Sequence, residues 1–144
     1  MKAILGIDPG LSTGFALYHD GKLQVLTTVR PHELADVIND FGGTQGIARI
    51  IFEDSRLTSH VFTTVKSRPA ALKMARNIGQ IDAWSGLINS VCEKLKIPCH
   101  GISPKQKGKK LNAEEFLRVT GWEYQSNQHE RDAAMCAWPY RGAL

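Results

Sequence analysis

The sequence predicts an α/β fold with a mixed five-stranded sheet, made of an antiparallel meander plus two parallel strands, with helices on both faces. Two observations predict it. Residues 3–27 carry three strand patterns joined by short turns, and from residue 31 onward helix and strand patterns alternate. With 144 residues, 42% of them hydrophobic, the chain is expected to form a single domain over residues 1–144.

The first three strands come from the N-terminal part of the chain. Residues 3–8 form a short apolar run that predicts a largely buried strand. Residues 15–18 predict a second strand, and Asp20-Gly21 is a turn signal before residues 23–27, which alternate apolar and polar side chains. Because connections this short join antiparallel neighbours, the three strands are expected to form a meander.

A helix and a parallel strand are expected next. Pro31 suits a first helical position, and Gly42-Gly43 is expected to end the helix. Between them, apolar residues recur at helical spacing: Leu34, Val37, Ile38 and Phe41. Residues 48–52 form an apolar run that favours a buried parallel strand, whereas residues 54–69 are polar and predict a loop.

A long helix is expected from Ala70 to Leu95, with apolar side chains on two sides. One stripe comprises Met74, Ile78, Ile81, Ser85, Ile88 and Cys92, and the other comprises Trp84, Leu87, Val91 and Leu95. The second stripe has two interpretations, because it could pack into the core or form a self-complementary dimer face.

The C-terminal third predicts a last strand over residues 97–102, followed by a basic loop over residues 103–110. Asn112 is expected to cap a short helix that continues to Val119, and residues 128–137 predict a terminal helix. The helical crossovers between the later strands are expected to add them in parallel to the same sheet.

Charge is unevenly distributed along the chain. The formal net charge is +4, yet residues 56–110 carry eleven Lys and Arg side chains against two acidic ones, and both flanking segments are acidic. A basic surface beside gathered carboxylates is what a nucleic-acid enzyme needs to neutralise phosphates and to hold cations. A solvated lysine-rich face is the alternative explanation.

Composition excludes several classes of protein. The three cysteines are too few and too widely spaced for a disulfide framework or a zinc cage, so we expect buried thiols in a reducing compartment. The apolar start is too short for a signal peptide, and no later run is long enough to span a bilayer. We therefore expect a soluble, cytoplasmic protein with no membrane partner.

Four positions have the chemistry of a metal-dependent hydrolase. Asp8 ends the first strand, Glu53 ends the crossover strand, and His129 and Asp132 are three apart on one face of the terminal helix. The ends of adjacent strands meet at a crevice, where a crossing helix would bring all four side chains together. Three carboxylates and an imidazole, with no lysine between them, repel one another unless cations intervene, and such donors suit Mg²⁺ or Mn²⁺.

Each of these residues taken alone has a simpler explanation. Asp8 before Pro-Gly is typical of a turn, and Glu53 followed by Asp54 is typical of a solvated strand end. His129 fits an ordinary helix surface, and Asp132 fits an exposed ion pair. The joint pattern is less expected by chance than any single member, so the four remain candidates together.

These residues resemble the RuvC-type Holliday-junction resolvases of the ribonuclease H-like superfamily. The resemblance is carried by Gly6-Ile7-Asp8-Pro9-Gly10 with Gly14, by the acid Glu53 after an apolar strand, and by His129-x-x-Asp132-Ala133-Ala134. Their order spans nearly the whole chain, and the compact length most resembles the bacteriophage branch of the family.

The resemblance implies a ribonuclease H-like fold and a homodimer that cuts two opposing strands of a four-way DNA junction, giving 5′-phosphate and 3′-hydroxyl ends. It implies two Mg²⁺ ions per active site, with Mn²⁺ as a substitute, held by Asp8, Glu53 and Asp132. His129 stands where family members carry Asp or His, and its role as ligand, proton shuttle or phosphate contact stays open. No nucleotide cofactor is implied, and the setting is the cytoplasm of a bacterial or phage-infected cell.

Seven basic residues are candidates for contacts with DNA phosphates: Arg68, Lys73, Arg76, Lys105, Lys107, Lys109 and Lys110. An inert solvated loop is the alternative explanation for the four lysines. His60 or Phe62, on the loop after Glu53, is a candidate wedge at the branch point. Two other functions stay open: a broader branched-DNA or RNA–DNA hybrid nuclease of the same fold, and a non-catalytic nucleic-acid-binding module.

Overall fold

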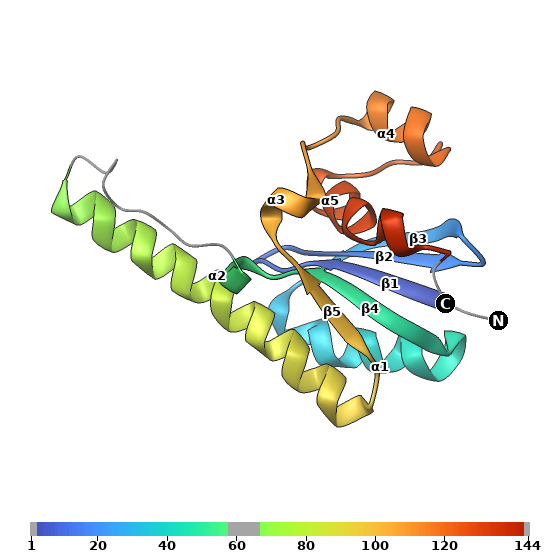
Figure 1. Cartoon of the computed structure of the whole chain (residues 1–144), viewed down its shortest axis with the longest axis horizontal. Helices are drawn as coiled ribbons and strands as arrows, with labels where there is room; N and C mark the ends of the chain where they lie inside the picture. The colour runs from blue at the N-terminus through green and yellow to red at the C-terminus, as the bar shows by residue number, and fades with distance from the viewer. Residues whose placement is uncertain (1–2, 58–66, 143–144) are drawn as a thin grey trace.

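The computed structural model describes residues 3–57 and 67–142. Five strands form one sheet in the order β3-β2-β1-β4-β5 (Figure 1). The strands are β1 (Ala3–Asp8), β2 (Thr13–His19), β3 (Lys22–Val29), β4 (Ile47–Glu53) and β5 (Cys99–Ile102). β1, β2 and β3 pair antiparallel, whereas β4 lies parallel to β1 and β5 lies parallel to β4. The predicted mixed sheet, a meander plus two parallel strands, is confirmed.

The turn between β2 and β3 has the geometry that its sequence predicts. Asp20 and Gly21 both have positive φ angles, 52° and 81°. A two-residue hairpin with both central residues in this region follows the right-handed twist of its strands, and Asp-Gly is a favoured pair for it. The turn therefore fixes the register in which His19 pairs with Lys22.

Helices and short 3₁₀ turns connect the strands. The α-helices are α1 (Leu34–Gln45), α2 (Arg68–Leu95), α3 (Pro104–Lys107), α4 (Ala113–Thr120) and α5 (Gln128–Ala137), and the 3₁₀ turns are η1 (Pro31–Glu33), η2 (Ser55–Leu57) and η3 (Trp138–Tyr140). The predicted Asn112 cap is present, since its side chain accepts a hydrogen bond from the Glu115 backbone N–H at 2.8 Å. Within the described residues, no helix combines the length and hydropathy that crossing a bilayer needs.

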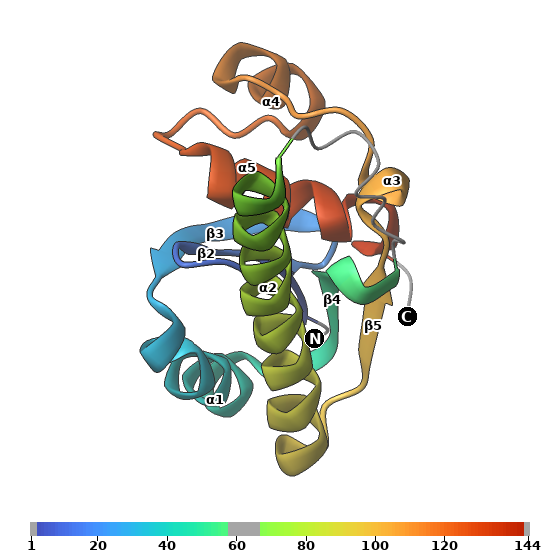
Figure 2. The same ribbon diagram turned by 90° about the vertical axis from the view of Figure 1, so that its left-hand side faces the viewer.

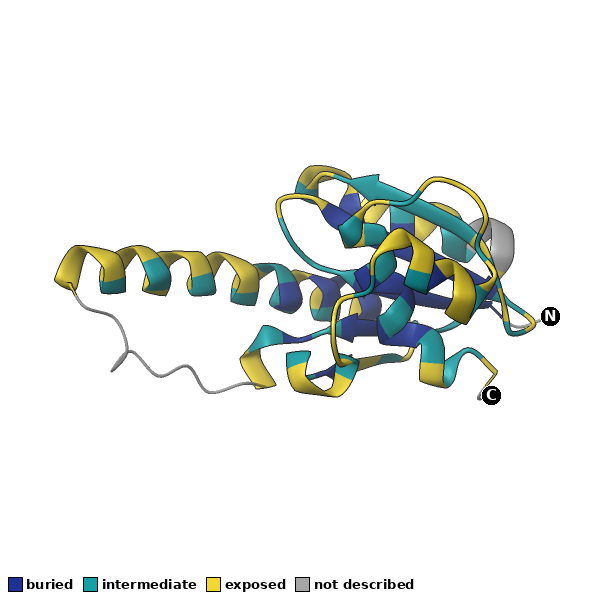
Figure 3. Ribbon diagram, turned by 90° about the horizontal axis from the view of Figure 1, so that it is seen from above, coloured by how far each residue is buried: buried dark blue, intermediate teal, exposed yellow. Residues whose placement is uncertain are grey.

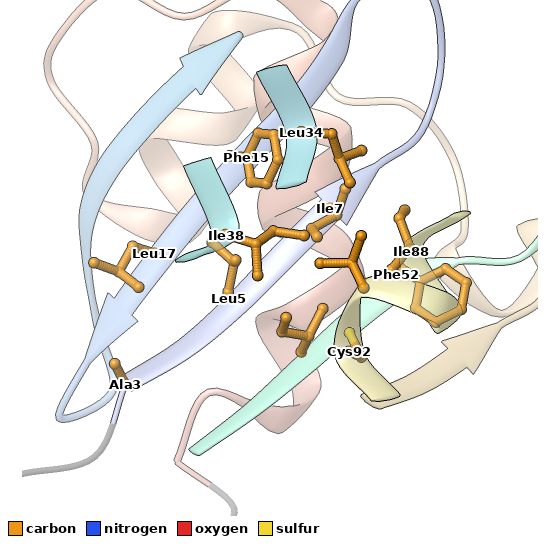
Figure 4. Packing of buried hydrophobic residues seen from close by; sticks show 12 residues of the cluster. Ala3, Leu5, Ile7, Phe15, Leu17, Leu34, Ile38, Phe52, Ile88 and Cys92 are labelled. Carbon is orange, nitrogen blue, oxygen red and sulfur yellow. The ribbon is translucent and has the colours of Figure 1, made fainter. Parts of the chain in front are cut away.

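Helices cover both faces of the sheet, as predicted. α1 and the C-terminal part of α2 lie against one face, and α5 lies across the other (Figures 1 and 2). The first face builds one hydrophobic cluster, in which Phe15, Ile38, Phe52 and Ile88 meet (Figure 4). The second face is covered by small residues of α5, among them Ala133 and Ala137, so that this helix approaches the strands closely.

The two halves of α2 have different surroundings. Its C-terminal half packs into the core through Ser85, Ile88, Val91 and Cys92. Its N-terminal half projects beyond the sheet and is largely exposed (Figures 1 and 3). The predicted second stripe is therefore divided: Val91 and Leu95 pack on the core, whereas the Leu87 side chain is 38% exposed.

Three local predictions were wrong, each because hydrogen bonding outweighed a composition signal. α1 continues through Gly42-Gly43 and ends at Gly46, whose φ of 65° provides the left-handed cap. Residues 55–57 form a 3₁₀ turn rather than an irregular loop, and residues 104–107 form one helical turn inside the predicted basic loop. The candidate wedge residues His60 and Phe62 lie outside the described residues.

Candidate active site

One pocket collects all four candidate catalytic residues. It has a volume of about 430 Å³ and lies where the ends of β1 and β4 meet α2 and α5. Its lining comprises Asp8, Pro9, Gly10, Leu11, Glu53, Asn77, Gln80, Ile81, Trp84, Lys107, Lys110, His129 and Asp132. Residues more than a hundred positions apart in the sequence therefore share one cavity.

Strand pairing explains why Asp8 and Glu53 are neighbours. β1 and β4 are parallel and adjacent, with Ile7 opposite Phe52 in their register. Each acid is the last residue of its strand, so both carboxylates emerge at the same end of the sheet. Their carboxyl groups are joined by a hydrogen bond, which the sequence could not predict.

α5 carries His129 and Asp132 to the same place. Its start is fixed by a capping box, in which Asn127 accepts from the Glu130 backbone N–H at 2.9 Å while Glu130 accepts from that of Asn127 at 3.0 Å. Glycines let the helix come close, because a β-carbon at Gly14 would overlap the His129 carbonyl oxygen.

Gly6 makes the equivalent contact further along α5. A β-carbon at Gly6 would overlap the Ala133 carbonyl oxygen. Gly6 and Gly14, two of the three glycines of the N-terminal motif, therefore serve helix packing, and through it the position of Asp132. Asp132 is buried, with 4% of its surface exposed, and its Oδ1 accepts a hydrogen bond from Gln128 Nε2 at 2.8 Å.

Lys107 lies between Glu53 and Asp132 in the pocket, although no lysine was predicted there. Its Nζ donates to Glu53 Oε2 at 2.8 Å and lies 3.8 Å from Asp132 Oδ2. Only 7% of its side chain is exposed, so Lys107 does not belong to a solvated basic surface as expected. The signal missed in the sequence was Ser103-Pro104 with Gln106, a capping pattern that turns α3 and aims its last residue into the pocket.

Burial and hydrogen bonding shift the pKa values of three groups in the pocket. Burial, together with the hydrogen bond to Glu53, raises the pKa of Asp8 to about 8. Burial also disfavours the Glu53 carboxylate, but hydrogen bonds from Asp8 and Lys107 outweigh it and lower the pKa of Glu53. Burial likewise opposes the charge of Lys107, but Glu53 and Asp8 raise its pKa, so the ammonium is retained.

The pocket opens to solvent beside His129 and Lys110. His129 Nδ1 lies 3.9 Å from Asp8 Oδ2, and half of the imidazole side chain, 51%, is exposed. Lys110 Nζ lies 3.4 Å from Asp132 Oδ2, with most of its side chain in solvent. The mouth of the pocket therefore offers one imidazole and one exposed ammonium group to an incoming anion.

The donor set fits a divalent cation. Carboxylate oxygens are the ligands that Mg²⁺ and Mn²⁺ prefer, and an imidazole is also accepted by Mn²⁺. Two observations favour a cation here: three carboxyl groups, of Asp8, Glu53 and Asp132, line one pocket, and an ammonium group already stands between Glu53 and Asp132. Among residues 3–57 and 67–142, no three His, Cys, Asp or Glu side chains are arranged closely enough to enclose a metal ion as they stand.

The other predicted DNA-contacting residues are spread over two surfaces. Arg68, Lys73 and Arg76 lie exposed along the projecting half of α2, and Lys105 is exposed on α3. Lys109 is also exposed, but its Nζ pairs with Glu115 Oε2 at 2.8 Å.

α2 supplies a wall of the pocket that sequence reasoning missed. Asn77, Gln80, Ile81 and Trp84 line it. Their spacing of three and four positions is a helical face, so the signal was present in the sequence. It was hidden because Ile81 and Trp84 were assigned to two different apolar stripes.

A second charged cluster, which we call the clamp, lies directly after β4 and comprises Asp54, Ser55, Arg56 and Asp82. Asp54 is 5% exposed, and its two carboxylate oxygens accept hydrogen bonds from Arg56 Nε and Nη2, both at 2.9 Å. Ser55 Oγ donates to Asp82 Oδ1 at 2.6 Å, which ties this segment to α2. The Arg56 hydrogen bonds lower the pKa of Asp54.

Comparison with known proteins supports the fold. No protein-family model and no curated protein sequence matches the chain. A structure described as T. thermophilus RuvC in complex with Holliday junction substrate is similar over 96% of this chain and 91% of its own, at 16% identity and a TM-score of 0.65. A second, described as Thermus thermophilus RuvC structure, is similar over 94% of this chain and 90% of its own, at 14% identity and a TM-score of 0.64.

The similarity to these two structures shows that the chain has an α/β fold with a ribonuclease H-like mixed sheet. More narrowly, the chain has a RuvC-like fold, as the sequence motifs predicted. The bacteriophage-type detail stays a prediction.

Proposed function

We propose that this protein is a metal-dependent endonuclease that resolves four-way DNA junctions, hydrolysing phosphodiester bonds to leave 5′-phosphate and 3′-hydroxyl ends. The observation that carries the proposal is the convergence of Asp8, Glu53, His129 and Asp132 in one pocket of a RuvC-like fold. The similar protein bound to a Holliday junction substrate supports branched DNA as the substrate class.

We assign Asp8, Glu53 and Asp132 to hold the ion, with His129 beside Asp8, and we propose Mg²⁺ with Mn²⁺ as a substitute. A divalent ion there supplies Lewis-acid activation of the phosphate and lowers the pKa of a water molecule. Asp8 is the residue on which binding depends most, because its buried carboxyl lacks the ammonium partner that Glu53 has at 2.8 Å.

The reaction needs one water molecule and no other co-reactant. The water oxygen forms a bond to phosphorus while the bond from phosphorus to the 3′ oxygen breaks. The water gives up a proton and the leaving 3′ oxygen takes one. His129, at the mouth of the pocket, is placed to exchange these protons with solvent, and Lys107 and Lys110 offset the charge of the phosphate.

The junction arms are assigned to the exposed basic residues. Arg68, Lys73 and Arg76 extend along the projecting half of α2, beyond the wall that lines the pocket, and Lys105 lies on α3 beside it. Phosphate contacts of this kind give affinity without reading sequence. They also make binding depend on salt, because each neutralised phosphate releases counterions.

We also propose a homodimer, because a four-way junction presents two equivalent strands to cut and a two-fold protein matches it. Leu72 and Leu87 on α2 are exposed by 62% and 38% and are candidates for the contact. Analytical ultracentrifugation tests this, and a monomer at micromolar concentration both with and without junction DNA would contradict it.

The test of the activity is cleavage of a labelled synthetic four-way junction with Mg²⁺ or Mn²⁺. We expect paired nicks from the wild type, no nicks from Asp8→Asn, and retained binding by both proteins. Equal or faster cutting of three-way, flap or RNA–DNA hybrid substrates would favour the broader nuclease. Binding without metal-dependent cleavage by the wild type would favour a non-catalytic module.

A further inference from the structure

The oxygens of the pocket are unequally available to metal ions. Asp132 Oδ1 accepts a hydrogen bond from Gln128 at 2.8 Å, while its Oδ2 has Lys110 at 3.4 Å and Lys107 at 3.8 Å. Glu53 Oε2 accepts from Lys107 at 2.8 Å. Between Glu53 and Asp132, the place of a cation is therefore taken by an ammonium group.

Lys107 is held in this place rather than lying there by chance. Its side chain is 7% exposed, whereas the neighbouring Lys110 side chain is 69% exposed. α3 aims it, because two hydrogen bonds fix that turn: the Ser103 backbone N–H donates to Gln106 Oε1 at 2.8 Å, and the Gln106 backbone N–H donates to the Ser103 carbonyl oxygen at 3.0 Å. Because the Lys107 side chain loses its conformational entropy when the protein folds, its ion pairs in the pocket carry no further entropic cost.

The remaining open position is beside Asp8. Asp8 Oδ2 faces His129 Nδ1 at 3.9 Å, a separation too long for a hydrogen bond. Both side chains line the solvent-accessible pocket, so an ion can enter between them without displacing Lys107.

We propose that Lys107 is the second cation of this site, so that the pocket takes one divalent ion, at Asp8, instead of the two that the sequence resemblance implies. The inference rests on the proposed nuclease function. One divalent ion and the Lys107 ammonium balance the three carboxylates Asp8, Glu53 and Asp132, and Lys110 adds a further positive charge at the exposed mouth of the pocket. A second divalent ion would give the pocket an excess of positive charge around Lys107, which is buried. Because like charges repel strongly where water is excluded, we expect that second ion not to bind.

The direct test counts Mn²⁺ bound to the full-length chain by electron paramagnetic resonance of the free ion. We expect one Mn²⁺ per wild-type chain. Lys107→Met, which keeps the length and loses the charge, is expected to bind two, because it opens the position between Glu53 and Asp132. Lys105→Met, an exposed lysine on the same helical turn, is the matched control and is expected to bind one.

Two Mn²⁺ per wild-type chain, or one per Lys107→Met chain, would overturn the inference and leave the proposed function standing. No Mn²⁺ on the wild type at millimolar concentration would overturn both. Lys107→Arg retains the charge and is expected to bind one ion, and together with the wild type it decides the question even if Lys107→Met fails to fold.

A second readout includes the substrate. With a four-way junction bound, the cleavage rate of the wild type at low Mn²⁺ is expected to double when the free Mn²⁺ concentration doubles. A fourfold increase would show that two ions enter together and would overturn the inference.

Discussion

Glu53 and Asp54 are consecutive acids at the end of one strand, yet they belong to regions with opposite electrostatic designs. In the clamp, Asp54 meets one guanidinium that satisfies both of its oxygens. In the pocket, Glu53 shares one buried ammonium with two further carboxylates. The Asp54–Arg56 pair has a structural role, because its charges are neutralised within the protein. The carboxylates of the pocket outnumber the cations buried with them, which is typical of a site that binds a positively charged ligand.

The shifts in pKa show the same difference. Hydrogen bonds from Arg56 lower the pKa of Asp54, as expected for a settled ion pair. Burial raises the pKa of Asp8 to about 8 even though Lys107 is near.

The largest expected effect is on cleavage when the two neighbouring acids are exchanged for their amides. Glu53→Gln is expected to slow junction cleavage by at least about 100-fold, because it removes the carboxylate charge that pairs with Lys107 and is hydrogen-bonded to Asp8. Asp54→Asn is the matched control and is expected to stay within about threefold of the wild type per folded molecule. Single-turnover kinetics measures both, and similar losses in the two variants would erase the distinction between pocket and clamp.

The clamp is expected to contribute more to the free energy of unfolding than an exposed acid does. Asp54→Ala is expected to lower the free energy of unfolding by about 1–3 kcal/mol, because it removes a buried carboxylate with three hydrogen bonds from Arg56. The exposed turn acid Asp20 serves as control, and Asp20→Asn is expected to be nearly neutral. Urea unfolding measures the difference, and an unchanged midpoint for Asp54→Ala would show that the clamp is dispensable.

The pocket is expected to make the metal-free protein sensitive to pH. The folded pKa of Asp8, about 8, lies above its unfolded value, so its contribution to stability is complete below pH 4 and is lost as the pH rises through 8. Asp8→Asn removes this loss while its amide can still donate to Glu53. In EDTA at pH 8, the variant is therefore expected to be more stable than the wild type by roughly 1–3 kcal/mol.

Thermal unfolding between pH 4 and pH 9 checks the sign of this effect. The advantage of Asp8→Asn should grow with pH up to about 8, and Ca²⁺ should stabilise the wild type alone. Parallel stability curves for the two proteins would mean that Asp8 is not destabilised by its burial.

The smallest expected effect concerns the projecting half of α2. Arg76→Ala is expected to weaken junction binding a few-fold and to reduce the slope of log affinity against log salt by about one. Lys22→Ala, at the start of β3, is the control for a lysine away from the pocket and is expected to leave the slope unchanged. Equal slopes for all three proteins would exclude a phosphate contact at Arg76.

Much of the fold was predictable because the local signals agreed with the tertiary structure. The apolar runs at β1 and β4, the Asp20-Gly21 turn and the Asn112 cap each act over a few residues and were confirmed. The end of α1 was wrong because Gly42-Gly43 only weakens a helix, whereas Gly46 adopts the left-handed conformation that ends it.

The site was predictable in part for the same reason. Asp8 and Glu53 stand at strand ends, which parallel pairing brings together whatever the rest of the chain does. Lys107 was wrongly predicted to lie on an exposed basic loop. The position of its side chain depends on the direction of the single helical turn α3, which hydrophobic periodicity does not indicate. Composition counted it as one of eleven basic residues, although it lies inside the acidic pocket.

The measurement that tests the central claim most directly is an anomalous difference map from crystals grown with Mn²⁺. We predict an anomalous peak within coordination distance of the Asp8 carboxylate in wild-type crystals. We predict no such peak in Asp8→Asn crystals under the same conditions. A wild-type map with no peak in the pocket, or with manganese bound only elsewhere, would contradict the assignment of these acids to a catalytic cation.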